Sequence, residues 1–309
     1  MMNKMISRLA AICAIMIAAV FMPGCEHNEL CYDHTHVTEL NVEFDWSQAP
    51  DADPSTMVVH FFRPDGSLYR RVEFTQRTGG KVRLEAGEYS ILFHNGNMET
   101  VYELGNSHSD YALSGVSRSI LEPMGREGDA PRPPESADQL IFSAPDQVWA
   151  GSHSAIEILP GVAGQTVKLT PVEATMEYTV EITGVENLRD DIDVSAAITG
   201  MSPLYRLAEG CHGGEAATLP ISVERVGDNT LVAHFRTFGH CPQTELAHTF
   251  SVYTSNKFFV NYDITEKMHN APDPRHVVIE IHGLRLPDAG MGTEISGWEN
   301  VEEYEIDMN

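Results

Sequence analysis

Short segments in which apolar and polar residues alternate recur along most of the chain. Met176–Thr183 alternates over its whole length (Met-Glu-Tyr-Thr-Val-Glu-Ile-Thr), and Val37–Trp46 has the same two-residue period. This period places successive side chains on opposite faces of a strand, so each segment is expected to bury one face. A sustained 3.6-residue stripe, which a long amphipathic helix requires, is missing from the sequence. The pattern therefore predicts an all-β protein.

Further strands are expected wherever this alternation or a short apolar run is bounded by turn residues. Pro64-Asp65-Gly66-Ser67 and Gly227-Asp228-Asn229 are turn sequences that favour hairpins. By contrast, the pattern dissolves between Gly105 and Ala137, where we expect a long surface loop. The remaining expected strands are Met57–Phe62, Leu68–Phe74, Val82–Leu84, Tyr89–Asn95, Gln147–Gly151, Ala155–Leu159, Thr166–Pro171, Asp193–Ile198, Thr218–Val226, Thr230–Phe238, His248–Tyr253, Phe258–Ile264 and Val277–Leu286.

The number and spacing of these strands indicate how many domains the chain forms. Short strands separated by turn signals are typical of antiparallel β-sandwiches. The chain of 309 residues is long enough for two such domains once an N-terminal segment is set aside. We therefore predict two tandem antiparallel β-sandwiches, residues 37–164 and residues 165–309, which meet near Gly164.

The first 24 residues have the features of a secretory signal peptide. Lys4 and Arg8 precede an uninterrupted apolar run, Leu9–Met22, which is shorter than the roughly 20 residues of a spanning helix. The run ends in Pro23-Gly24-Cys25, which is similar to a lipoprotein cleavage site. We therefore expect Cys25 to be the lipidated, palmitate-bearing first residue of the mature chain, with residues 25–36 as a tether. The alternative is an ordinary signal peptide cleaved at another position.

A lipid anchor of this kind holds a protein on a membrane without spanning it. No other segment is long and apolar enough to cross a bilayer. The formal net charge is −25, and loss of Lys4 and Arg8 with the signal peptide takes it to −27. Because such a surface repels phosphate groups, we predict a partner other than nucleic acid.

Cysteine usage adds one candidate cross-link. The mature chain keeps Cys25, Cys31, Cys211 and Cys241. Export leads through an oxidising compartment, which favours a disulfide between Cys211 and Cys241. Closing their loop of about 30 residues is worth roughly 3–4 kcal/mol in the chain-entropy model. Free thiols are an alternative state of this pair, and Cys31 is left over.

Two groups of residues offer metal ligands. His34 and His36 lie in the polar tether and are weak candidates for zinc or copper. Cys211-His212 and His240-Cys241 form two mirrored pairs, which offer a Cys₂His₂ zinc site as an alternative to the disulfide. A polar tether and a disulfide account for these residues without a metal, so we predict no cofactor.

Catalytic motifs are missing from the sequence. It contains neither a Gly-x-Ser-x-Gly nucleophile elbow, nor a phosphate-binding Gly-rich loop, nor a His-Glu-x-x-His zinc motif. Ser152 and His153 are neighbours on an expected strand, so their side chains point to opposite faces. We therefore predict that the protein is not an enzyme, with a hydrolase as the least favoured alternative.

Several stretches together resemble a known family. The start of the mature chain, Cys25–His34 (Cys-Glu-His-Asn-Glu-Leu-Cys-Tyr-Asp-His), is similar to that of surface lipoproteins from gut and oral anaerobes. Leu84–Tyr89 before an apolar strand, Asn95, and Val167–Pro171 (Val-Lys-Leu-Thr-Pro) at the domain junction resemble recurring elements of the fimbrillin superfamily. The resemblance is to its anchor and accessory lipoproteins in particular.

This resemblance implies two transthyretin-like β-sandwiches displayed on the outer membrane at the cell surface. In fimbriae of this family, a strand of one subunit completes a sheet of the next, which is strand addition. We therefore predict a fimbrial anchor or accessory subunit that acts in cell adhesion through contacts with other surface proteins. The alternative is a stand-alone glycan- or host-binding lipoprotein. An unpaired edge strand in the second domain favours the first function, and a concave face with exposed aromatic residues favours the second.

Overall fold

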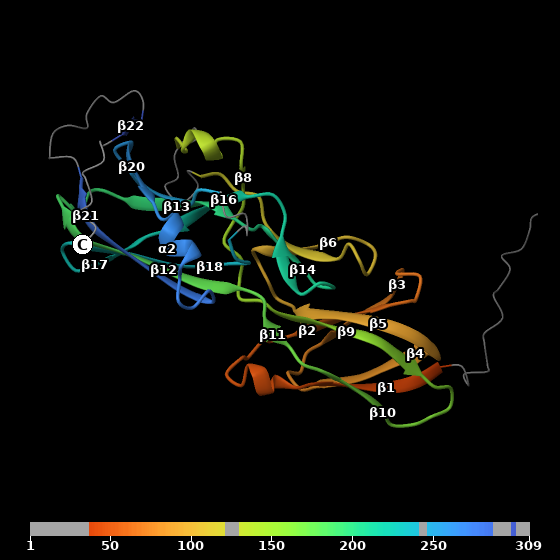
Figure 1. Ribbon diagram of the computed structural model, residues 1–309. Coiled ribbons are helices and arrows are strands. Elements are labelled where there is room, and N and C mark those ends of the chain that lie inside the picture. The colour runs from red at the N-terminus through yellow and green to blue at the C-terminus, as the bar shows by residue number, and fades with distance from the viewer. Residues whose placement is uncertain (1–36, 121–129, 241–245, 287–297, 301–309) are drawn as a thin grey trace, which may run out of the picture. The chain divides into compact units, whose positions relative to one another are not determined.

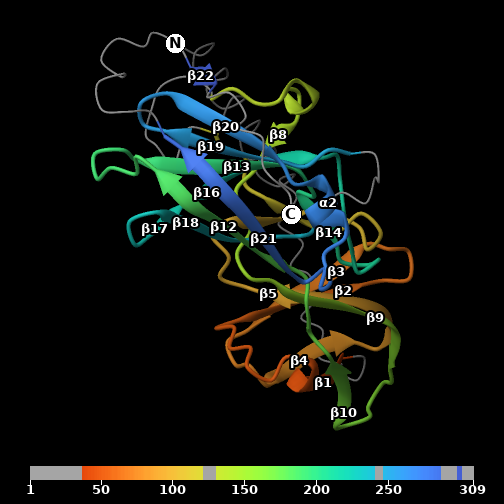
Figure 2. The same cartoon turned by 60° about the vertical axis from the view of Figure 1, so that its left-hand side comes forward.

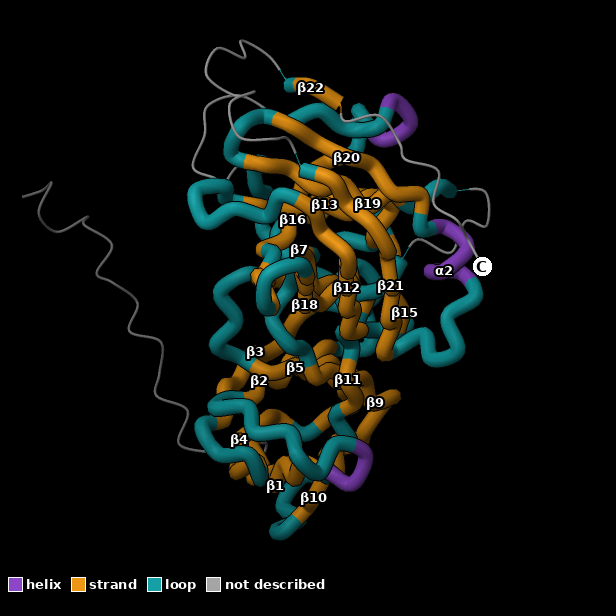
Figure 3. Tube along the Cα trace, turned by 90° about the vertical axis from the view of Figure 1, so that its left-hand side faces the viewer, coloured by secondary structure: helices purple, strands orange, loops and turns teal. Residues whose placement is uncertain are grey.

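The computed structural model describes residues 37–120, 130–240, 246–286 and 298–300. These residues form an almost entirely β-stranded fold (Figure 1), which confirms the predicted fold class. The helices among them are single turns, namely η1 (Trp46–Gln48), η3 (Pro134–Ser136) and α2 (Thr265–His269), drawn in purple in Figure 3. Within this described part of the chain, no helix has the length and apolarity needed to cross a bilayer.

The first sandwich consists of two sheets whose inner faces share one core. The smaller sheet has the order β10-β1-β4 and the larger one the order β11-β9-β5-β2-β3. Alternate residues of these strands, such as Val42, Phe61, Ile91 and Phe93, are at most 1% exposed and pack between the sheets. The strands are β1 (Val37–Phe44), β2 (Met57–Phe62), β3 (Leu68–Phe74), β4 (Gly79–Glu85), β5 (Gly87–Asn95), β9 (Trp149–Ile158), β10 (Gln165–Leu169) and β11 (Val172–Glu173).

The second sandwich repeats this plan with longer sheets, which Figure 2 shows side by side in green and blue. Their strand orders are β17-β18-β12-β21 and β22-β20-β19-β13-β16-β8. Tyr178, Ile198, Phe250 and Ile279 are among the buried residues of the shared core. The strands are β8 (Leu140–Ile141), β12 (Met176–Glu186), β13 (Val194–Met201), β16 (Ala217–Ser222), β17 (Glu224–Val226), β18 (Thr230–Thr237), β19 (Thr249–Thr254), β20 (Phe258–Asp263), β21 (His276–Arg285) and β22 (Glu299–Asn300).

Each sandwich contains one prominent parallel strand pair, which a purely antiparallel arrangement lacks. β1 pairs with β10 in parallel, and β12 pairs with β21 in parallel along nearly its whole length. Since the partners are far apart in sequence, no turn between them fixes their direction. Thr218–Val226, expected as one strand, is divided instead into β16 and β17, which belong to different sheets of the sandwich.

A third, small sheet joins segments from both halves of the chain. Its strand order is β15-β14-β7-β6, made of β6 (Val101–Leu104), β7 (Ala112–Gly115), β14 (Leu204–Arg206) and β15 (Cys211–Gly213). β7 is buried along its whole length, and Leu113 and Ile120 are 0% exposed. The expectation of a surface loop over residues 105–137 was therefore wrong for this part. The burial comes from β14, a partner about ninety residues away along the chain.

The centre of the larger sheet of the first sandwich, formed by β2 and the second half of β5, is buried on both faces. Phe61 faces the core of the sandwich, whereas its neighbour Phe62 packs into a separate apolar cluster with Leu113, Tyr205 and Phe238. We call this second set the bridging cluster, because it contains residues from both halves of the chain. Its members are Phe62, Leu92, Val101, Tyr111, Leu113, Val148, Ala150, Ala174, Tyr205, Leu207 and Phe238.

The predicted boundary between residues 164 and 165 stays a prediction. β10, which begins at Gln165, pairs with β1 of the first sandwich, and β11 pairs with β9. β8 instead pairs with β16 of the second sandwich, although it precedes both in sequence. These pairings favour a boundary after Glu173.

Candidate functional site

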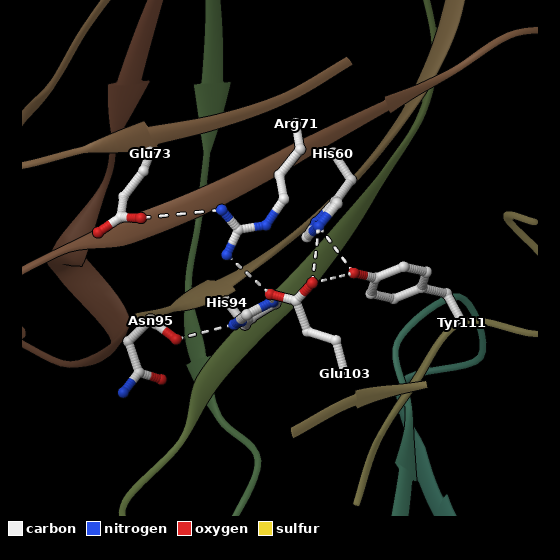
Figure 4. A network of polar contacts seen from close by, with 7 residues as sticks. All are labelled: His60, Arg71, Glu73, His94, Asn95, Glu103 and Tyr111. Carbon is white, nitrogen blue, oxygen red and sulfur yellow. Dashed lines mark hydrogen bonds and ion pairs between the residues drawn. The ribbon is translucent and has the colours of Figure 1, made fainter. Parts of the chain in front are cut away.

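A polar network surrounds the carboxylate of Glu103 on the outer face of the larger first-sandwich sheet (Figure 4). Arg71 Nη2 donates to Glu103 Oε1 at 3.0 Å, and the Tyr111 hydroxyl donates to Oε2 at 2.5 Å. His60 Nε2 lies 3.4 Å from Oε2, and His94 Nε2 lies 3.3 Å from Oε1. Three side chains from different strands and Tyr111, which directly precedes β7, therefore converge on one acid group.

Strand register places these side chains on one face. His60 stands directly opposite Arg71 in the β2–β3 pair. In the β2–β5 pair, His94 stands opposite Val58, which is two positions before His60 on β2 and so has its side chain on the same face. Side chains at directly opposite positions point to the same face of a sheet. Glu103 comes from β6, so the network ties the small third sheet to the first sandwich.

The hydrogen bonds fix most of the protons in the network. The Tyr111 proton goes to Glu103, so the tyrosine oxygen accepts from His60 Nε2 at 2.7 Å. His94 Nδ1 donates to the carbonyl of Asn95 at 2.7 Å, because a carbonyl only accepts. His94 Nε2 then faces Glu103 and attracts it only when a second proton makes the ring cationic.

Burial shifts the pKa of Glu103 and the pKa of His60 in opposite directions. It lowers the pKa of His60, and it would raise that of Glu103 if the acid were alone. Hydrogen bonds from His60, Arg71 and Tyr111 outweigh this and hold the pKa of Glu103 well below its usual range. Burial also raises the pKa of Tyr111, which stays protonated. At neutral pH, Glu103 is therefore a carboxylate and His60 a neutral ring.

His60, His94 and Glu103 also form a possible metal-ligand set. Their ligand atoms all lie within 4.8 Å of one another, and two imidazoles with a carboxylate suit zinc or iron. However, Arg71 and Tyr111 already occupy both oxygens of Glu103. A metal cation would have to displace these donors and lie beside the guanidinium. The geometry therefore favours a network of ion pairs and hydrogen bonds that connects two sheets, and not a metal centre.

This network was not among the candidates drawn from the sequence. A local signal was present, because His60 lies within the otherwise apolar strand Met57–Phe62 and His94 directly follows the apolar run Ile91–Phe93. A titratable residue in a strand buried on both faces needs a polar partner. Glu103 could not be identified as that partner, because it comes from the segment next to the expected loop.

The free energy of unfolding is expected to decrease as the pH falls from about 6.5 towards 4. Burial lowers the folded-state pKa of His60, His240 and His248, that of His240 to about 4. The unfolded chain binds these protons near its ordinary pKa of about 6.5, so below that pH it holds more protons than the folded protein. Thermal melting at about pH 7, 5.5 and 4.5 checks this sign. In His240→Ala the melting temperature should depend less on pH, and an unchanged slope would contradict the assignment.

A second feature is the outer edge of β21 in the second sandwich. β21 is ten residues long and ends its sheet, so among the described residues no strand pairs with its outer side. Lys267 Nζ donates to the carbonyl of Glu280, which shows that this carbonyl points away from β12. Because backbone groups alternate between the two sides of a strand, Val278 presents its N–H and C=O at the same edge. The Val278 side chain is 64% exposed.

The sites predicted from the sequence fall largely outside the described residues. Cys25, His34, His36 and Cys241 all lie there, and their predicted roles stay predictions. Cys211 is exposed on β15, where its Sγ donates to a carboxylate oxygen of Glu209 at 3.5 Å.

The segments on either side of the predicted disulfide do lie close together. A Cβ atom at Gly239 would lie only 3.0 Å from Nδ1 of His212, the residue after Cys211. Gly239 is two positions before Cys241 along the chain. This proximity supports the Cys211–Cys241 disulfide, which stays a prediction.

Comparison with known proteins identifies relatives. The model of the family described as "Domain of unknown function (DUF5119)" matches residues 24–222. The chain is 23% identical over 227 residues to the "Putative fimbrium anchoring subunit Fim4B" of Bacteroides ovatus. That alignment covers 72% of this chain but only 63% of the relative. The resemblance to fimbrial anchor proteins inferred from the sequence is thereby confirmed.

Solved structures share the fold at low sequence identity. A crystal structure of a "putative adhesin" from Bacteroides ovatus has a TM-score of 0.61 at 18% identity, covering 83% of this chain and 96% of the other. A crystal structure of "putative polysaccharide binding proteins" from Bacteroides thetaiotaomicron has a TM-score of 0.50 at 11% identity, covering 80% and 90%. At these identities the likeness establishes the fold alone.

Proposed function

This chain belongs to the family described as "Domain of unknown function (DUF5119)", and we propose that it is a cell-surface lipoprotein that anchors a fimbria or serves as its accessory subunit. It binds other surface proteins by strand addition and is held on the outer membrane by a lipid at Cys25. The relative named as a fimbrium anchoring subunit supports this assignment.

The observation that carries the proposal is the edge of β21. Strand addition needs a sheet edge with free backbone donors and acceptors, and side-chain pockets or apolar contacts that set the register. Among the described residues, no strand pairs with the outer edge of β21 in the second sandwich, and the exposed Val278 offers an apolar contact beside it. Lys267 blocks one carbonyl, at Glu280, so the stretch around Val278 is the acceptor segment.

Glycan binding on an aromatic platform finds less support. Trp46 and Trp149 pack edge to face with ring centroids 6.3 Å apart, next to the first core. Trp298 packs in the same way against Tyr253, with centroids 5.6 Å apart. The three tryptophans therefore make internal contacts and do not form a shared exposed surface. A stand-alone binding lipoprotein remains the alternative outcome of the following experiment.

The decisive experiment compares wild type with Cys25→Ala in cells. Wild type should incorporate a fatty-acid probe, be cleaved by protease added to intact cells, and co-purify with fimbrial subunits. Cys25→Ala should be unlabelled and released. A labelled and protease-accessible protein that purifies alone would support the stand-alone alternative. An unlabelled wild type would refute the lipid anchor.

Val278→Pro is expected to abolish partner binding while leaving the fold intact. Proline removes the backbone N–H that faces the open edge, and sheets tolerate proline at such edge positions. Co-purification with fimbrial subunits measures the loss. Val278→Thr, which keeps the N–H and the β-branched shape, should bind like wild type. If Val278→Pro melts at the wild-type temperature and still binds its partner, β21 is not the acceptor.

A further inference from the structure

Three arginines gather on one side of the first sandwich. Arg63 lies in the turn before β3, Arg70 on β3 and Arg83 on β4, and all three side chains are exposed. β3 ends the larger sheet and β4 ends the smaller one. Arg70 Nη1 donates to the backbone carbonyl of Arg83 at 2.5 Å, which brings these two sheet edges together. We call the three residues the arginine cluster.

Tyr69 connects Arg63 to the other two members. The guanidinium carbon of Arg63 lies 4.6 Å from the centroid of the Tyr69 ring, which is a cation–π contact. The hydroxyl of Tyr69 accepts from the backbone N–H of Glu85 at 3.4 Å, two residues after Arg83 on β4. Because a contact with a ring face uses none of the five N–H donors of a guanidinium, Arg63 can still donate to a further acceptor.

The positive charge of the cluster is not neutralised within the described part of the chain. None of its three guanidinium groups forms an ion pair there, whereas Arg71 and Lys81 on the same two strands are each paired with an acid. Asp65 and Glu39 attract members of the cluster only from beyond ion-pair distance. The cluster therefore offers its charge and its donors to an anion from outside the chain.

This side of the molecule differs in charge from the chain as a whole. The formal net charge of the chain is −25, yet residues 63–83 contain six basic and two acidic residues, a formal charge of +4. At an ionic strength of about 0.1 M the Debye length is about 10 Å, so an approaching surface interacts mainly with the charges nearest to it. Carboxylates elsewhere on the molecule are then largely screened, and the arginine side faces a negative surface.

The cluster also lies where the chain enters the first sandwich. β1 begins at Val37, which stands opposite Glu85, the residue that contacts Tyr69. The expected tether, residues 25–36, has twelve residues and spans at most about 40 Å when fully extended. A lipid at Cys25 therefore keeps the arginine side of the sandwich within about 40 Å of the membrane surface.

We propose that the arginine cluster binds the phosphate groups of lipid headgroups at the membrane surface beside the tether. This inference rests on the proposed function, whose lipid anchor brings the cluster to that surface. Guanidinium groups donate to phosphate oxygens in a bidentate geometry, and each basic residue close to an anionic surface adds to the binding. An acyl anchor and a basic patch together hold a protein more firmly than either alone. The first sandwich is then held on the membrane in one orientation.

The test uses the whole mature chain carrying Cys25→Ala, because a chain without lipid can bind vesicles only through its own side chains. At about 0.1 M salt it should sediment with vesicles of phosphatidylcholine and phosphatidylglycerol and stay in solution with phosphatidylcholine alone. At about 1 M salt, where the Debye length falls to about 3 Å, it should be released. Adding Arg63→Gln/Arg70→Gln/Arg83→Gln should weaken binding roughly 100-fold, about 5-fold for each arginine.

A matched triple variant removes the same charge elsewhere. Arg189→Gln/Arg225→Gln/Arg236→Gln changes three arginines of the second half that are each paired with an acid, and it should bind like the parent chain. Full binding by the variant of the arginine cluster, or no preference of the parent for anionic vesicles, would overturn the proposal. Unchanged vesicle binding with loss of co-purified fimbrial subunits would instead assign the cluster to an acidic protein partner. Melting curves show whether the cluster variant is folded, and Arg83→Gln alone, with its smaller effect, replaces it if not.

Failure of this inference can be told apart from failure of the proposed function. Fatty-acid labelling of the full chain in cells tests Cys25 by itself, and the arginine substitutions should leave it unchanged. A labelled chain whose Cys25→Ala form ignores anionic vesicles would refute the headgroup site and leave the lipid anchor. An unlabelled chain whose Cys25→Ala form binds them would refute the lipid anchor and support the headgroup site.

Discussion

Glu103→Ala should lower the free energy of unfolding by about 2–3 kcal/mol. Removing one partner of a fully buried ion pair costs about 3–5 kcal/mol, because the remaining charge loses its compensation. Glu103 has a side chain that is 29% exposed, so water reduces this cost. The loss of Glu103 removes an acceptor from Arg71 and Tyr111, and Tyr111 in turn contacts His60, which is 0% exposed. Urea denaturation followed by fluorescence measures the change.

The chain offers a matched control for this prediction. Glu73 also contacts Arg71, at 3.8 Å, but both side chains are 44% exposed. Exposed ion pairs contribute about 0–1 kcal/mol, so Glu73→Ala should have little effect. If Glu103→Ala and Glu73→Ala had the same free energy of unfolding, Glu103 would not be the acid that connects the third sheet to the first sandwich.

Phe62→Ala should lower the free energy of unfolding by about 3–5 kcal/mol, the usual cost of a phenylalanine cavity in a packed core. Phe62 is 0% exposed and packs edge to face against Tyr111, with ring centroids 5.8 Å apart. It belongs to the bridging cluster, which includes Tyr205 and Phe238 from the second half of the chain. We therefore also expect the variant to unfold in two steps, since the contacts that couple the two halves are weakened.

Phe61→Ala is the informative comparison for this prediction. Phe61 is equally buried but faces the core of the first sandwich alone. It should cost a similar free energy while leaving the coupling between the halves intact. Leu68→Ala, at a position that is 40% exposed, should change stability by less than about 1 kcal/mol. Limited proteolysis during the urea titration distinguishes one-step from two-step unfolding, and a single transition in Phe62→Ala would contradict the bridging role.

Local patterns correctly predicted most of the strands. Alternation predicted β1 and β12, and the run Met57–Phe62, apolar except for His60, predicted a strand that is buried along its whole length. The prediction was wrong where burial depends on a distant partner. β7 is short and lies among Gly, Ser and charged residues, and only its pairing with β14 buries it.

The candidate sites depended still more on distant contacts. His60 and Glu103 are forty-three positions apart, and their contact follows from the placement of the third sheet. His240 was noticed in the sequence only beside Cys241. Its neighbours in space, His248 and His269, come from the start of β19 and the end of α2.

The sequence by itself determined the strand content and the face that each strand buries, and it predicts a signal peptide with a lipidation site. These depend on residue order over a few positions, where side-chain alternation and an apolar run act directly. The tertiary structure alone decided the parallel pairing of β12 with β21, the outer edge of β21, which pairs with no strand among the described residues, and the Glu103 network. These features depend on which distant strands become neighbours and in what register, and that is set by how two whole sandwiches bury their apolar faces together.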